Sequence, residues 1–257
     1  MPPGDLAVII PARNEADRIT ATVTAAGKLE GADLVVVVDD GSDDQTARLA
    51  EAAGARVVRH PRSRGKAAAM QTGAEAVRLI EAGRMPPAAP GTVPRYLLFL
   101  DADLAETAAG AGPLADPVRS GSADATIAIF ASRVRKGGFG FVVGTAGAGI
   151  ERAIGWRPVQ PLNGMRCLTR AAFDAVQPLA KGWGVETAMT IDLVRAGLRI
   201  CEVEVPLSHR ATGNDWRAQL HRLHQLVDVL RALAVREPAV RRMRRERAGR
   251  PAAPAGG

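Results

Sequence analysis

Short apolar runs alternate with longer segments of helical composition, and this alternation limits the fold more than any other feature of the chain. Strands that alternate with helices are typical of βαβ units, in which a largely parallel sheet carries helices on both faces. Three of the runs, LAVII, LVVVV and YLLFL, are almost entirely apolar, as expected for central parallel strands. The expected strands span residues 6–10, 34–38, 56–58, 96–100, 125–130 and 199–205, and the early helices span 15–27, 43–53 and 66–82.

Charged or glycine-containing turns follow four successive strands at the point where each strand ends. They are PARNE (11–15), DDGSDD (39–44), HPRSRGK (60–66) and DADLAE (101–106). In open sheets of this class, ligands bind beyond the carboxyl ends of the strands. The sequence therefore predicts a binding site along that edge of the sheet.

Asp101 and Asp103 follow an apolar strand with one alanine between them. Residues i and i+2 of an ideal strand lie roughly 7 Å apart, too far for both carboxylates to bind one ion directly. The pair must therefore lie where the strand ends and the chain turns. There the carboxylates can reach a divalent cation that keeps water and phosphate oxygens as its other ligands. The alternative is a solvent-facing strand end whose aspartates cap the next helix.

Two further charged pairs also indicate a ligand. Helix capping accounts for Ser42 and Asp43 but not for Asp39 and Asp40, whose adjacent charges call for a donor-rich ligand such as a nucleobase or ribose. Lys66, with Arg64, stands at the start of a helix, where basic side chains oppose the positive end of the helix dipole. A bound phosphate would offset that cost, although a solvated basic loop is the alternative.

Composition bears on the partners of the chain. The net charge is +7, but only four of the 34 basic residues are lysine and aromatic residues make up 4%. No basic and aromatic interleaving of the kind that stacks single-stranded bases is present, so nucleic-acid binding is not expected. The longest apolar runs are far shorter than the roughly 18 residues that span a bilayer, and the N-terminus lacks the features of a secretory signal. Cys167 and Cys201 have no metal-ligand spacing. We expect a cytoplasmic protein.

Four motifs together resemble the family 2 glycosyltransferases and their relatives with the GT-A fold. They are VIIPARNEA (8–16), VVVVDDGSDDQT (35–46), RGKAAAM (64–70) and YLLFLDADL (96–104), in the order and spacing of that family. The resemblance implies a nucleoside diphosphate sugar as donor and Mg²⁺ or Mn²⁺ bound at a DXD-type motif formed by Asp101, Ala102 and Asp103. The implied donor-binding residues are Pro11, Ala12, Arg13, Glu15, Asp39, Asp40, Gly65, Lys66, Asp101 and Ala102.

The second half of the chain contains PLNG (161–164) and GWGVE (182–186). These stretches are similar to the PLxG and GxGxE pattern of the glucosyl-3-phosphoglycerate synthase type, and polyprenyl-phosphate sugar transferases show a looser arrangement. Asn163 and Met165 depart from the residues expected after PL in the phosphoglycerate enzymes. The implied acceptor-side residues are Leu162, Asn163, Gly164, Gly184 and Glu186, and His209 is implied as a metal ligand beside Asp101 and Asp103.

The resemblance also implies a domain division. We expect one Rossmann-like, GT-A type domain over residues 1–237, with a nucleotide-sugar-binding half at 1–104 and an acceptor-side half at 105–237. Leucines and valines at helical spacing predict a helix over 216–236, and the proline-rich segment 84–94 predicts a surface loop. A basic tail with a disordered composition follows at 238–257.

The expected reaction is metal-dependent transfer of a hexose to a small phosphorylated or acidic acceptor. Asp103 and Lys66 would stabilise the leaving diphosphate, and Glu186 would take the acceptor's proton if the configuration inverts. Polyprenyl phosphate, a lipid phosphate at the membrane surface, is the alternative acceptor. A sugar-phosphate nucleotidylyltransferase would need a glycine-rich N-terminal loop, which IIPARNEA does not contain. A third alternative is an inactive transferase-like module that contacts the inner face of the membrane through its basic tail.

Overall fold

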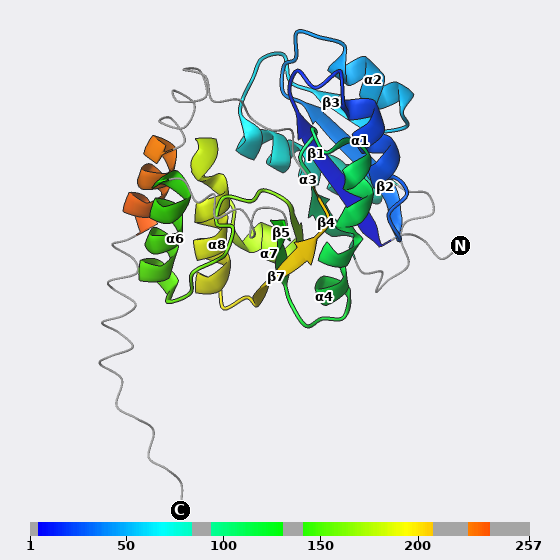
Figure 1. Cartoon of the computed structure of the whole chain (residues 1–257). Helices are drawn as coiled ribbons and strands as arrows, with labels where there is room; N and C mark the ends of the chain where they lie inside the picture. The colour runs from blue at the N-terminus through cyan, green and yellow to red at the C-terminus, as the bar shows by residue number, and fades with distance from the viewer. Residues whose placement is uncertain (1–4, 84–93, 131–140, 208–225, 237–257) are drawn as a thin grey trace, which may run out of the picture.

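A computed structural model describes residues 5–83, 94–130, 141–207 and 226–236, which form a seven-stranded sheet with helices on both faces (Figure 1). The strand order is β3-β2-β1-β4-β6-β5-β7. The strands are β1 (Leu6–Ala12), β2 (Ala32–Asp39), β3 (Arg56–Arg59), β4 (Tyr96–Phe99), β5 (Ala125–Phe130), β6 (Arg166–Leu168) and β7 (Ile200–Val205). The predicted α/β class with a mostly parallel sheet is confirmed.

Strand β6 reverses the direction of the sheet. It pairs antiparallel with β4 and β5, whereas β1, β2, β3 and β4 run parallel and β5 runs parallel to β7. All six expected strands are present, but the sequence did not predict β6, because three residues are too few to show a period. Since β6 runs against β4, its first residue, Arg166, lies opposite Phe99, the last residue of β4. The loop before β6 therefore reaches the edge where β4 ends.

The helices divide between the two faces of the sheet. Alternate residues of β1 point to opposite sides, so that Val8 and Ile10 pack with α1 and η1 while Ala7 and Ile9 pack with α3. The helical elements are α1 (Ile19–Ala26), α2 (Thr46–Ala52), α3 (Lys66–Ala82), η1 (Ala105–Leu114), α4 (Asp116–Arg119), α6 (Phe141–Ile154), α7 (Arg170–Ala175), η2 (Gly182–Gly184) and α8 (Val185–Arg195). The three early helices are confirmed with bounds close to those expected.

A layer of α6, α8 and the helix at 226–236 lies beside the sheet (Figure 1). Helix α6 contains Gly144, Gly147 and Gly149, and Gly149 allows close packing, because a Cβ there would lie 2.3 Å from Leu233 Cδ1. An ion pair from Arg236 Nε to Asp192 Oδ1, 2.8 Å long, links 226–236 to α8. The helix predicted over 216–236 is thus present over 226–236. Three other predictions concern residues outside the described ranges: the loop at 84–93, His209 and the basic tail.

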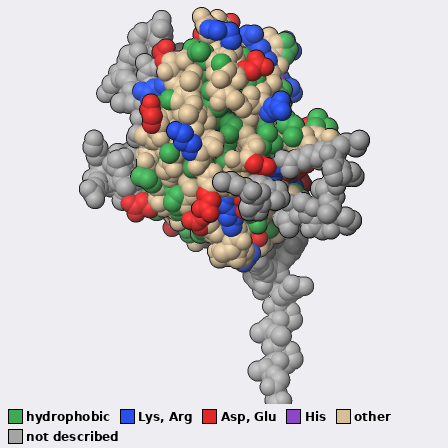
Figure 2. All heavy atoms as spheres, turned by 90° about the vertical axis from the view of Figure 1, so that its right-hand side faces the viewer, with side chains coloured by type: hydrophobic (Ala, Val, Ile, Leu, Met, Phe, Trp, Pro, Cys, Tyr) green, Lys and Arg blue, Asp and Glu red, His purple; other side chains and the backbone are tan. Residues whose placement is uncertain are grey.

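The strands before and after residue 104 belong to one sheet. The expected division into a nucleotide-sugar-binding half and an acceptor-side half at this residue stays a prediction. None of the helices in the described ranges is both long and apolar enough to cross a membrane. On the face in Figure 2, acidic and basic side chains occur together, so the excess of basic residues does not form a separate patch there.

Gly73 tests the packing of α3 on the sheet. A Cβ at this position would lie 2.4 Å from Ile9 Cγ2 and 3.3 Å from Val38 Cγ2, and both side chains are fully buried. Gly73→Ala should lower the free energy of unfolding by about 1–2 kcal/mol, since an overpacking cost of about 2–3 kcal/mol outweighs the roughly 1 kcal/mol gain in helix propensity. Gly144→Ala in α6, where a Cβ meets no atom within 4 Å, should stabilise instead. Urea unfolding measures both, and an unchanged stability of Gly73→Ala would contradict the packing.

Candidate active site

The polar residues predicted along the carboxyl edge come from the ends of parallel strands. Ala12 and Asp39 are the last residues of β1 and β2 and lie side by side in register. Asp101 follows β4 by two residues, and Lys66 is the first residue of α3. The fold therefore brings these donor-side candidates to one edge, as the sequence predicted.

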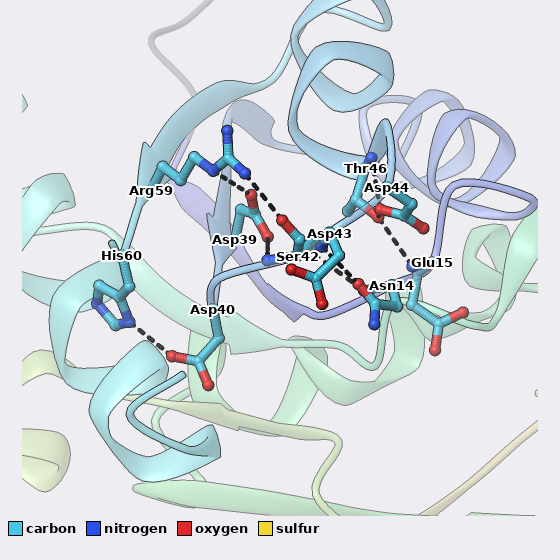
Figure 3. Close-up of polar contacts among 10 residues, drawn as sticks. All are labelled: Asn14, Glu15, Asp39, Asp40, Ser42, Asp43, Asp44, Thr46, Arg59 and His60. Atoms are coloured by element: carbon cyan, nitrogen blue, oxygen red, sulfur yellow. Dashed lines mark hydrogen bonds and ion pairs between the residues drawn. The ribbon is translucent and has the colours of Figure 1, made fainter. Parts of the chain in front are cut away.

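The loops after β1 and β2 are tied together by side chains that accept backbone hydrogen bonds (Figure 3). Asn14 N donates to Ser42 Oγ at 2.9 Å, and Asp43 N donates to Asn14 Oδ1 at 2.9 Å. Glu15 N donates to Thr46 Oγ1 at 2.8 Å. Asn14 has a φ of 55°, a left-handed conformation that asparagine tolerates better than most residues. These hydrogen bonds join the two loops into one unit, and the Glu15 carboxylate points away from it (Figure 3).

Asp39 is fully buried and has one carboxylate oxygen without a hydrogen bond. Its Oδ1 accepts from Ser42 N at 3.0 Å. Its Oδ2 lies 3.1 Å from Arg59 Nε, close enough for an ion pair, but the orientation gives it no hydrogen bond from any described residue. Arg59 instead donates through Nη2 to Ser42 O at 2.8 Å. A buried carboxylate oxygen is costly without a donor, so Asp39 offers an acceptor position to a ligand N–H.

Asp40, in contrast, obtains its donors within the protein. His60 Nδ1 lies 2.7 Å from Asp40 Oδ1, within hydrogen-bond distance, and the carboxylate accepts from Ser63 Oγ, Arg64 N and Gly65 N at 2.7–2.8 Å. The expectation that Asp40 needs an external donor is therefore corrected, because its carboxylate holds the loop before α3. Burial raises the pKa of Asp40, but these hydrogen bonds outweigh burial and lower the pKa to about 2.

Lys66 joins the donor side of the site to the acceptor side. Its Nζ lies 2.8 Å from Asp101 Oδ1 and 3.1 Å from Glu186 Oε1. Burial alone would lower the pKa of Lys66, but the charges of Asp101 and Glu186 outweigh burial and raise it. Gly164 leaves room for the ammonium, because a Cβ at 164 would lie 2.1 Å from Lys66 Nζ. Three of the predicted residues, Lys66, Asp101 and Glu186, thus meet at one point, with Gly164 beside them.

Asp101 and Asp103 lie in a turn directly after β4, as their spacing required. Thr22 of α1 holds this turn, since its Oγ1 donates to Ala102 O and accepts from Ala105 N, both at 2.8 Å. Both aspartates are partly exposed. Hence their carboxylates are accessible from the edge of the sheet, in line with a ligand site.

A divalent cation fits the chemistry of this turn. Carboxylate oxygens are hard ligands that suit Mg²⁺ or Mn²⁺. Within the described residues, no three His, Cys, Asp or Glu side chains are grouped so as to hold a metal ion. Asp101 and Asp103 can therefore provide part of a coordination sphere that ligand oxygens or water would complete. His209, the third ligand implied by the resemblance, lies outside the described residues.

Two predicted acceptor-side residues have structural partners instead. The Asn163 side chain is buried, donates through Nδ2 to Ala128 O at 2.7 Å and accepts from Met165 N at 2.9 Å. A Cβ at Gly184 would lie 2.5 Å from Asp228 O, so this glycine allows the 226–236 helix to approach α8. The Asn163 side chain and the space beside Gly184 are thus taken up by contacts within the protein. Leu162, which precedes Asn163, is partly exposed.

The sequence patterns did not single out Arg59, His60 or Arg166. Arg59 and His60 follow the expected third strand, and their proximity to Asp39 and Asp40 depends on the pairing of β2 with β3. Arg166 begins a strand that the sequence did not reveal. Pro11 and Ala12 end β1, and Arg13 is exposed beyond it.

Asp40 provides a test of the loop that it holds. Asp40→Asn should lower the free energy of unfolding at pH 7 by about 1–3 kcal/mol, because charge-assisted hydrogen bonds are lost. The folded pKa is lowered, so the contribution of Asp40 is present above its ordinary pKa of 3.8 and disappears as the pH falls toward 2. Urea unfolding between pH 7 and pH 3 should show the difference narrowing below pH 4. The exposed Asp43→Asn is the control, and a pH-independent difference for Asp40→Asn would contradict this assignment.

Known proteins resemble the chain in sequence. The model of glycosyl transferase family 2 matches residues 7–174. Glycosyltransferase AglJ of Haloferax volcanii is 31% identical over 217 residues, which cover 83% of this chain and 66% of that protein. Glucosyl-3-phosphoglycerate synthase of Mycolicibacterium paratuberculosis is 29% identical over 204 residues, which cover 73% of this chain and 59% of that protein. The chain thus spans less than two thirds of the length of these relatives.

Solved structures share the fold. Glucosyl-3-phosphoglycerate synthase of Mycobacterium tuberculosis in complex with phosphoglyceric acid has a TM-score of 0.69 and 26% identity, with 91% of this chain and 80% of that chain covered. The same enzyme with Mn²⁺ and UDP-glucose has a TM-score of 0.68 and 26% identity, with 90% and 79% covered. The expected GT-A fold is confirmed. Together with the match over 7–174, these likenesses show that the chain belongs to glycosyl transferase family 2.

Proposed function

We propose that this chain is a metal-dependent hexosyltransferase that uses a nucleoside diphosphate sugar and a small phosphorylated acceptor. The observation that carries the proposal is the position of Lys66 between Asp101 of the donor-side turn and Glu186 of the acceptor side. A transferase needs its donor and its acceptor to meet beside a cation that stabilises the leaving group. Lys66 supplies such a cation at the meeting point.

Uracil is the base that the donor site favours. Its ring presents an N–H between two carbonyl oxygens, so it needs an acceptor flanked by donors. Asp39 Oδ2 is a buried acceptor that receives no hydrogen bond from the described residues, and Arg59 Nε lies 3.1 Å from it. The complex of the mycobacterial synthase with Mn²⁺ and UDP-glucose supports the same choice of donor.

Transfer breaks the bond between the sugar and the diphosphate, so negative charge builds on the leaving nucleotide. Lys66 stabilises that charge at close range in a partly buried site. A Mg²⁺ or Mn²⁺ held by Asp101 and Asp103 would supply Lewis-acid stabilisation of the same oxygens. The resemblance adds His209 to this ligand set. Each cation thus acts on charge that is larger in the transition state than in the bound donor.

Glu186 is the proposed base if the reaction inverts the configuration of the sugar. Its carboxylate is buried and accepts a hydrogen bond from Lys66. Lys66 engages Oε1, so the other oxygen of the Glu186 carboxylate would take the acceptor's proton while Lys66 holds the carboxylate in place. In a retaining reaction, Glu186 would instead orient acceptor hydroxyl groups.

The choice of nucleotide is tested by thermal unfolding with UDP, GDP or ADP, each with and without Mn²⁺. Binding at 100 times Kd stabilises by about 2.7 kcal/mol, so we expect the largest rise in Tm with UDP and Mn²⁺. Asp39→Asn should remove the preference for UDP, because it replaces the carboxylate acceptor with a neutral amide. Asp43→Asn, an exposed change in the same loop, is the control. Equal shifts with all three nucleotides would contradict the uracil assignment.

The reaction is tested with UDP-glucose, 3-phosphoglycerate and Mn²⁺, with detection of the glucosylated product. Asp103→Asn should lower transfer by about 100-fold or more, since a metal-binding carboxylate is lost while its shape is kept. Asp116→Asn, an exposed change at the start of α4, should leave transfer unchanged. Full activity of Asp103→Asn would refute the metal role. Product formed only with polyprenyl phosphate in liposomes would assign the lipid acceptor instead.

A further inference from the structure

Arg166 is a fully buried arginine at the start of β6, and no role for it follows from the motifs. Its backbone pairs with Phe99 on one side and Ile127 on the other, so it lies next to the strand that leads to Asp101. Buried arginines are rare unless they are paired with carboxylates. The partners of this guanidinium therefore matter for its role.

The guanidinium connects two segments of the acceptor side. Its Nε donates to Asn163 O at 3.1 Å, and its Nη2 donates to Glu186 O at 3.0 Å. Its Nη1 donates to Thr190 Oγ1 at 3.0 Å, and that hydroxyl donates to Glu186 O at 2.9 Å. Arg166 thus holds the loop that ends at Gly164 against the first turns of α8.

The acceptors that the described residues provide to Arg166 are neutral oxygens, which makes its burial costly. Burial lowers the pKa of Arg166 to about 10, although the charges of Glu186 and Glu202 act in the opposite direction, so it stays protonated at neutral pH. Arg95, another buried arginine, instead donates from Nε to Asp33 Oδ1 at 2.6 Å and forms an ion pair with Glu81. A charge buried without a hydrogen-bonded carboxylate contributes little to stability compared with a well-packed apolar side chain. Stability alone does not account for Arg166.

The two segments that Arg166 joins form opposite sides of the Lys66 ammonium site. A Cβ at Gly164 would lie 2.1 Å from Lys66 Nζ and 3.1 Å from Glu186 Oε1, so the gap between loop and helix has little spare width. We propose that Arg166 is a positioning residue, which sets this gap and thereby places the Glu186 carboxylate against Lys66 for transfer. The proposal rests on the transferase function and deepens its acceptor side.

The central variant is Arg166→Met, which keeps the apolar stem and removes the guanidinium. We expect kcat for glucose transfer from UDP-glucose to 3-phosphoglycerate to fall about 10-fold or more, because small displacements of reacting groups are costly. The Kd for UDP with Mn²⁺ should stay within about twofold, since the donor residues lie on other loops. Arg95→Met is the matched control, and it should lower Tm while leaving kcat within about twofold under conditions where both variants are folded.

Two threonines of α8 give a milder pair of variants that keeps the test decisive if Arg166→Met does not fold. Thr190→Val removes the hydroxyl between Arg166 and Glu186, and we expect kcat to fall about three- to tenfold. Thr187→Val removes a buried hydroxyl that has no hydrogen-bond partner in the described structure, so kcat should not change. The double variant Arg166→Met/Thr190→Val should be no slower than Arg166→Met alone, because both changes break one network.

Hydrogen exchange gives a readout that does not depend on the reaction. Amides of residues 163–165 and 186–190 should exchange faster in Arg166→Met than in Arg95→Met. Wild-type kcat in Thr190→Val, or exchange at these amides equal to that of the control, would overturn the positioning role while the transferase function stood. Absence of transfer by the wild-type chain would overturn the function itself.

Discussion

The contact of Lys66 with Asp101 and Glu186 is the interaction on which the site depends. It brings together a turn after β4, the start of α3 and the first turn of α8. A single ammonium balances two carboxylates that would otherwise repel each other in a partly buried space. In the proposed reaction, the diphosphate of the donor would be a third anion beside this ammonium, so the ion pairs of the structure and the proposed chemistry use the same charge.

The buried polar side chains around Lys66 differ in their hydrogen-bond partners. Asp40 receives donors from its own chain and holds the loop before α3. Within the described part of the chain, one carboxylate oxygen of Asp39 receives no hydrogen bond. Arg166 uses its donors on neutral oxygens of the acceptor side. The adjacent residues Asp39 and Asp40 thus differ in their hydrogen-bond partners although their side chains are identical.

Much of the donor side was predictable because it depends on local patterns. Apolar runs predicted the six longer strands, and the rule that ligands bind at carboxyl strand ends predicted the edge where Asp39, Lys66 and Asp101 lie. The strand β6 was not predictable, because three residues carry no periodic signal. Its antiparallel direction brings Arg166 and Gly164 to the site. The contacts of Asn163 and Gly184 were also not evident from the sequence, since their neighbours come from distant segments.

The sequence by itself determined the α/β class, the order of the strands along the chain and the set of charged residues at one sheet edge. Only the tertiary structure decided which of those charges meet one another. Local propensity depends on neighbouring residues, whereas the partners of a buried charge are set by segments that the fold brings together. For this reason the motif around Lys66 was evident from the chain, but its contact with Glu186 and the support from Arg166 were not.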